Sequence, residues 1–193
     1  MNATGICNLA LGYLGQNPIS TLGVDTSTAG KLCSAFYPGA KRALLESRNW
    51  TFSKKVWAVT PAAAPTHPVW VGAYAVPAEC MRVQRVDDGS GDYRLGWERI
   101  GAQILTDDTP ATIYVEGVYC PAADGDEAGY PQAFCFALAA HLATELCIPL
   151  TENATLWTAL LKVSELKVRE ASGSDGSQGR SEFIRSDSLA RRR

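Results

Sequence analysis

The sequence predicts an α+β protein: a small bundle of about four helices, an antiparallel β insertion between the two helix pairs, and an extended C-terminal tail. Apolar residues recur at helical spacing in the first fifty residues and again after residue 130. Between these regions, short alternating segments are separated by Gly, Pro and Asp clusters, which is typical of strands and turns. We therefore expect a helical domain from 1–50 and 130–171, a β insertion at 51–129, and a flexible docking tail at 172–193.

The composition is that of an ordinary globular protein. Of the 193 residues, 46% are apolar and 20% are charged, and the formal net charge of −2 gives no general attraction to nucleic acid or to anionic membranes. No apolar run approaches the roughly 20 residues of a membrane span. Met1–Gly5 carries no basic n-region and no cleavage motif. We therefore expect neither a signal peptide nor a contact with a membrane.

The six cysteines are scattered without a C-x-x-C pair, so we expect free thiols in a reducing compartment. Cys135, His141 and Cys147 lie on one predicted helix, but the two cysteines are separated by about 18 Å of helix and cannot share an ion. The acidic turn Asp87–Asp92 lacks the spacing of an EF-hand calcium loop. The sequence therefore predicts no metal site and no cofactor.

The first predicted helix runs from about Asn2 to Leu14, where apolar residues recur at i, i+3, i+4 and i+7, and Gly15 ends it. The second covers roughly Ser27 to Arg48. Asp25 and Thr26 precede it and are the candidates for its N-cap.

The second helix has two further features. Pro38 lies inside it and predicts a kink, because the ring removes a backbone hydrogen bond. Lys41, Arg42 and Arg48 place positive charge toward its C-terminal half, where the helix dipole favours it. We interpret this basic cluster as a solvated face, with a phosphate contact as the alternative.

Short strands are predicted where β-forming residues cluster or alternate with polar ones, at residues 56–59, 81–86, 94–100, 103–105 and 111–118. Trp50, Trp57, Trp70 and Trp97 fall in or beside this region. Such residues are more often core than a platform for a ligand.

The second helix pair begins with the run from Phe134 to Ile148, which is apolar at almost every position and should be buried on most sides. Pro149 is expected to end this helix. Thr151 is expected to cap the amphipathic helix that follows. A lone histidine in such a buried helix, His141, is usually structural.

The tail combines a flexible part with apolar residues. Ser172–Arg180 has the composition of a flexible linker, and Phe183, Ile184 and Leu189 follow before the closing Arg191–Arg193. Apolar residues after such a linker favour a docking segment that becomes ordered on a partner, with plain disorder as the alternative.

Several motifs, weak singly, occur in a specific order: Ile6–Gly15, Pro18–Leu22, the segment Cys33–Phe52 with its W-x-F exit, Trp70–Val83, and Tyr130–Phe134. Together they cover most of the chain. In order and spacing they resemble the head-to-tail adaptors of short-tailed phages, the tail tubular protein A family of head-completion proteins.

The resemblance implies a structural virion protein and not an enzyme, present in the host cytoplasm during assembly and in the neck of the finished virion. It implies a homo-oligomeric ring, a dodecamer, that joins the portal protein to the tail nozzle or tail tube. Phage DNA would pass through the ring and be contacted non-specifically. The portal-binding residues of the tail would be Phe183, Ile184, Arg185, Leu189, Arg191, Arg192 and Arg193.

A cyclic ring needs two different patches on each subunit, and the second and fourth helices are the candidates to supply them. We expect Lys41, Arg42, Arg48 and Trp157 at this subunit interface.

Two alternatives remain open. No nucleophile elbow, P-loop or zinc-protease motif appears, but a virion-associated cell-wall hydrolase would need only two well-placed carboxylates. Its candidates are Glu46, Glu79, Glu98 and Glu145. A DNA-binding module is disfavoured by the near-neutral charge.

Overall fold

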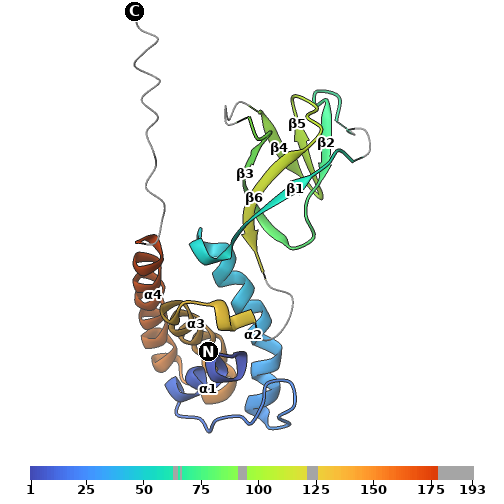
Figure 1. Ribbon diagram of the computed structural model, residues 1–193. Helices are drawn as coiled ribbons and strands as arrows, with labels where there is room; N and C mark the ends of the chain where they lie inside the picture. Colours follow the sequence, from blue (N-terminus) through green and yellow to red (C-terminus); the bar gives the residue numbers. More distant parts are fainter. Residues whose placement is uncertain (63–64, 66, 91–94, 121–125, 178–193) are drawn as a thin grey trace, which may run out of the picture.

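The computed structural model describes residues 1–62, 65, 67–90, 95–120 and 126–177. Within these ranges the chain forms a helical bundle and a β module that projects from one end of the bundle (Figure 1). The predicted α+β class, with a β insertion between two helix pairs, is confirmed.

The bundle contains four α-helices, α1 (Ala3–Tyr13), α2 (Thr28–Ser47), α3 (Gln132–Thr151) and α4 (Ala154–Gly176). The central helix is α3, which packs against each of the other three. This position explains why its sequence is apolar on almost all sides. By length and composition alone α3 would pass as a membrane span, but 61% of its most apolar window is buried inside the bundle.

The β module consists of two antiparallel three-stranded sheets. One has the order β1-β6-β3, formed by Lys54–Val59, Ile113–Tyr119 and Cys80–Asp87; the other has the order β2-β5-β4, formed by Gly72–Ala75, Gln103–Thr106 and Trp97–Ile100. A separate small core, Tyr74, Val86, Ile104, Ile113 and Val115, joins them. The sequence did not predict β2, because its four residues are mostly small and show no alternation.

An aromatic cluster lies where the chain passes between the two parts. Phe134 on α3 contacts Trp50, Phe52 and Tyr130, with ring centroids 4.8–5.1 Å apart and steep interplanar angles. The Trp50 indole also donates a hydrogen bond to the Leu44 carbonyl at 2.9 Å. Trp50, predicted to belong to the β region, is therefore part of the helical core. The cluster therefore packs the residues that lead into β1, Trp50 and Phe52, against Tyr130, which precedes α3.

Several predicted helix ends are wrong. Ser27 caps α2, its hydroxyl accepting from the Gly30 amide, whereas Asp25 accepts from the amides of Ser20 and Ser27 in the preceding turn. The helix α2 contains Pro38, in agreement with its predicted range from Ser27 to Arg48.

The same applies to the turn between α3 and α4. Pro149 lies within the last turn of α3, which ends only after Thr151, with Glu152 in the left-handed region at φ 50°. Asn153, and not Thr151, caps α4 by accepting from the Leu156 amide at 2.9 Å. The Thr151 hydroxyl instead donates back to the Cys147 carbonyl at 2.6 Å. Pro149 has no N–H to donate to the carbonyl four residues earlier, so α3 loses one backbone hydrogen bond in its last turn and still continues to Thr151.

The helix α4 continues to Gly176, into the segment Ser172–Arg180 that was predicted to be a linker. Its last turns are held because Ala171 and Asp175 are both buried. Packing therefore overrides the weak helix propensity of the Gly and Ser residues there. The rest of the predicted tail, from residue 178 onward, lies outside the described residues.

Candidate functional site

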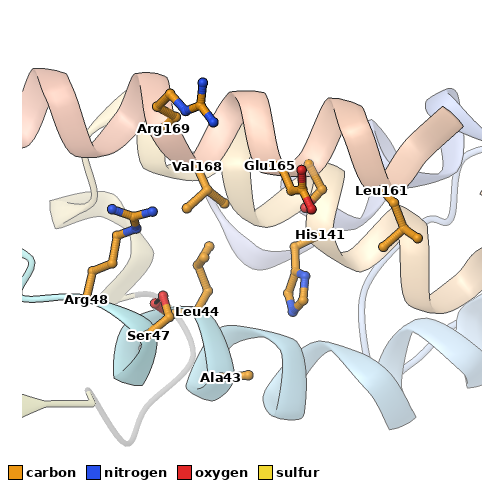
Figure 2. Close-up of a pocket in the computed structure, with 10 residues that line it drawn as sticks. Ala43, Leu44, Ser47, Arg48, His141, Leu161, Glu165, Val168 and Arg169 are labelled. Carbon is orange, nitrogen blue, oxygen red and sulfur yellow. Dashed lines mark hydrogen bonds between the residues drawn. The ribbon is translucent and has the colours of Figure 1, made fainter. Parts of the chain in front are cut away.

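A groove lies between α2 and α4 of the bundle and is referred to below as the α2/α4 groove (Figure 2). Because α3 packs against both helices, it forms the floor of a groove of about 480 Å³. The lining residues are Ala43, Leu44, Ser47 and Arg48 of α2, His141 of α3, and Leu161, Ser164, Glu165, Val168 and Arg169 of α4.

Charges are ordered along this groove. Arg48 and Arg169 lie together at one end, Glu165 and His141 lie in the middle, and Leu161 lies at the other end (Figure 2). The basic end is the one nearer the β module, since α2 and α4 both run toward it (Figure 1). His141 is thus half-buried at a groove floor and not enclosed in the core, which corrects its predicted position.

A second, polar pocket of about 540 Å³ adjoins the basic end of the groove, and we call it the junction pocket. Its lining comes from the α2–β1 connection, β3 and the end of α4: Ser47, Arg48, Asn49, Trp50, Thr51, Lys54, Arg82, Ser172, Asp175 and Gly176. The Arg82 guanidinium donates to the Asn49 side-chain oxygen. The lining therefore includes three basic side chains, Arg48, Lys54 and Arg82, and one buried carboxylate, Asp175.

That carboxylate, Asp175, links the end of α4 to the start of the β module. Its Oδ2 atom accepts from the Thr51 amide at 2.6 Å and from the Thr51 hydroxyl at 2.8 Å. The residue is 6% exposed, and no described residue makes a hydrogen bond to its buried Oδ1 atom. A buried acceptor without a partner is costly, so this atom is a candidate for binding a donor that the described residues do not supply.

A second buried acid, Glu127, lies in the 3-10 helix η2 (Asp126–Gly129) and is fully buried. Its Oε1 atom accepts from the Tyr37 hydroxyl at 3.0 Å and lies 3.1 Å from the Lys41 ammonium. Burial and the Glu127 carboxylate both raise the pKa of Tyr37, so its hydroxyl remains a donor. The predicted solvated position of Lys41 is therefore wrong: its charge is neutralised inside the subunit.

The other residues predicted at a subunit interface are exposed. Arg42 pairs with Glu46 one helical turn away at 3.0 Å, and Arg48 is shared between the groove and the junction pocket. Trp157 lies near the start of α4 and is 37% exposed. The structure does not bring these three residues together on one element.

The four candidate hydrolase carboxylates are exposed and come from different segments. Glu46 and Glu145 lie on α2 and α3 of the bundle, whereas Glu79 and Glu98 lie in the β module, and Glu79 pairs with Lys55. No cluster of three or more His, Cys, Asp or Glu residues with metal-binding geometry occurs among the described residues. All six cysteines are free thiols.

The predicted portal-binding residues, Phe183 to Arg193, lie outside the described residues. Sequence reasoning missed Glu127, Glu165 and Asp175. For Asp175 a signal existed: it follows Leu160, Ser164 and Ala171 at helical spacing, all of which are buried.

No known protein-family model matches the chain, and no curated protein matches it significantly.

Proposed function

We propose that this protein is a structural virion component, a head-to-tail adaptor that forms a ring joining the portal to the tail nozzle around the DNA channel. The observation that carries the proposal is that the fold has two parts, each with its own hydrophobic core. One helical bundle has surfaces suited to packing between subunits, and a separate β module, with its own core, projects from one end.

The bundle offers more than one apolar surface. Trp157 and Leu166 on α4 are 37% and 52% exposed. Nine helical residues separate them, which places them on opposite sides of the helix. Phe136 and Ile148 add exposed apolar surface on α3. A cyclic ring is built from heterologous contacts, which require two different patches on each subunit, and these residues satisfy that requirement.

The β module suits a second contact, because its own core makes it a unit distinct from the bundle. Val56 and Tyr114 are exposed and face the same side of the β1-β6-β3 sheet, since Val56 pairs with Glu116 and Ala58 with Tyr114. An exposed apolar sheet face of this kind is suited to a protein partner. We assign it to the nozzle or tube protein, and the helical end to the ring and portal.

The test is the assembly state of the full chain, measured by sedimentation velocity with and without the portal protein. The wild-type protein should sediment as a ring or should form one on the portal. Trp157→Glu should weaken assembly strongly, because a charge is buried at the contact. Val24→Glu, at a more exposed apolar residue in the α1–α2 loop (71% against 37% for Trp157), is the control and should assemble normally. A wild-type protein that stays monomeric and ignores the portal contradicts the proposal.

A further inference from the structure

The α2/α4 groove is open along its length in the part of the chain that the structure describes, and the chain leaves the bundle at its basic end. We propose that this groove is the docking site of the chain's own C-terminal segment, residues 180–189, which folds back along α4. Ser177 caps α4 beside the junction pocket, which Gly176 itself lines. The segment therefore starts where the groove begins.

The lengths match. Asp175 and Glu165 are ten helical residues apart, which is about 15 Å along α4. Arg180 and Arg185 are five residues apart, which is about 17 Å in an extended chain. If Arg180 lies beside Asp175, an extended segment running back along α4 brings Arg185 to Glu165.

The charges match in the same register. Arg180 would supply a donor to the buried Oδ1 atom of Asp175, for which no described residue is a partner. Glu182 would then lie beside Arg48 and Arg169 at the basic end of the groove. Because opposite charges follow each other in complementary order along segment and groove, this direction is favoured over the reverse one.

The apolar residues match as well. Phe183 and Ile184 fall between the two charge pairs, where Leu44 and Val168 line the groove (Figure 2). Leu189 would be about 30 Å from Arg180 in an extended chain.

The groove face of α4 is long enough for a segment of this length. Trp157 is about 27 Å from Asp175 along α4, one turn before the groove residue Leu161. Its exposed indole is therefore placed to contact Leu189 in the free subunit, before ring formation covers it. A segment joined to the groove by so short a linker has an effective concentration of about millimolar, so modest contacts suffice to hold it.

The consequence rests on the proposed function. Phe183, Ile184 and Leu189 are the residues expected to anchor the portal. Docked in the groove, these apolar side chains are shielded until a portal competes for them, which limits premature contacts of the free subunit.

The experiment uses the full chain with the photo-crosslinking residue p-benzoylphenylalanine in place of Phe183, without portal. Irradiation should give an adduct within one chain, and mass spectrometry should locate it on peptides that contain Leu44 or Val168. Glu165→Arg should lower the adduct yield about fivefold, the upper range for a partly exposed ion pair. Adding Arg185→Glu should restore the yield, because the pair is re-formed with its signs exchanged.

The matched control is Glu170→Arg on the same helix. Glu170 is exposed, pairs with Lys167 at 2.9 Å and does not line the groove, so this change should leave the yield unaltered. Adducts outside the groove, adducts only between two chains, or an equal loss in both variants would overturn the proposal. Because this experiment contains no portal, such a result does not contradict the adaptor proposal. Conversely, a failure to bind portal does not contradict docking of the segment in the groove.

Discussion

At the scale of single residues, Lys41 and Glu127 form a buried ion pair in the bundle. It ties α2 to η2, which precedes α3, with both side chains almost fully removed from water. Such a pair contributes little over an apolar replacement, but losing one partner leaves a buried charge uncompensated.

Lys41→Met should therefore lower the free energy of unfolding by about 3 kcal/mol, measured by urea denaturation. The double variant Lys41→Met/Glu127→Gln should recover most of the loss, because the glutamine is neutral and still accepts from Tyr37. Arg42→Met is the control, and it should cost under about 0.5 kcal/mol because its pair with Glu46 is exposed. Equal losses for Lys41→Met and Arg42→Met would refute this account of the pair.

A second residue, Asp25, makes the stability depend on pH. The hydroxyl of Ser27 and the amides of Ser20 and Ser27 hydrogen-bond its charged form and hold the pKa of Asp25 well below its usual range. A lowered pKa in the folded state means that this contribution is complete above the unfolded-state pKa, about 3.9, and is lost as the pH falls through the folded value.

Asp25→Asn should accordingly be less stable than the wild type at pH 7, and the difference should shrink below about pH 4. Urea midpoints measured from pH 7 to pH 2 test this. A constant difference across that range would show that the Asp25 charge has no part in the turn.

At the scale of elements, the turn between α3 and α4 contains the one positive φ angle of a non-glycine residue among those described, at Glu152. The left-handed conformation costs roughly 1–2 kcal/mol for a residue with a Cβ atom, more than the entropic cost of glycine. Glycine is also the usual residue at this helix position.

Glu152→Gly should therefore raise the thermal midpoint, with a gain of about 0.5–1 kcal/mol in unfolding free energy. Glu152→Ala keeps the Cβ atom and is the control, which should bring no such gain. Calorimetry distinguishes the two. A lower midpoint for the glycine variant would mean that the Glu152 side chain matters more than its backbone.

Some elements of the fold are predicted by local sequence and others are not. Four helices and five of the six strands among the described residues follow from the sequence, because apolar residues recur at helical spacing, fill the central helix or alternate in short segments. The end of α4 does not follow, since its Gly and Ser residues resemble a linker until Ala171 and Asp175 are seen to be buried. The α2/α4 groove does not follow either. It depends on how far α3 holds two helices apart, which no local pattern encodes.

At the scale of the whole molecule, bundle, β module and tail have separate tasks in the proposed adaptor. Removal of residues 180–193 should leave the helicity unchanged, since the described fold ends before them. Portal attachment in a pull-down assay should be lost. Removal of residues 190–193 alone keeps the apolar anchors but deletes three arginines, so attachment should persist, weaker than that of the full chain and less sensitive to added salt. Full attachment of the chain that lacks residues 180–193 would refute the role of the tail.

The central claim is that the protein forms a ring on the portal, and electron microscopy of the purified full chain, alone and mixed with portal, tests it most directly. The account predicts a closed ring seated on the portal, with the β modules pointing away from the ring of bundles, and the images would give the copy number. Particles that remain single subunits and portals that remain bare would contradict it.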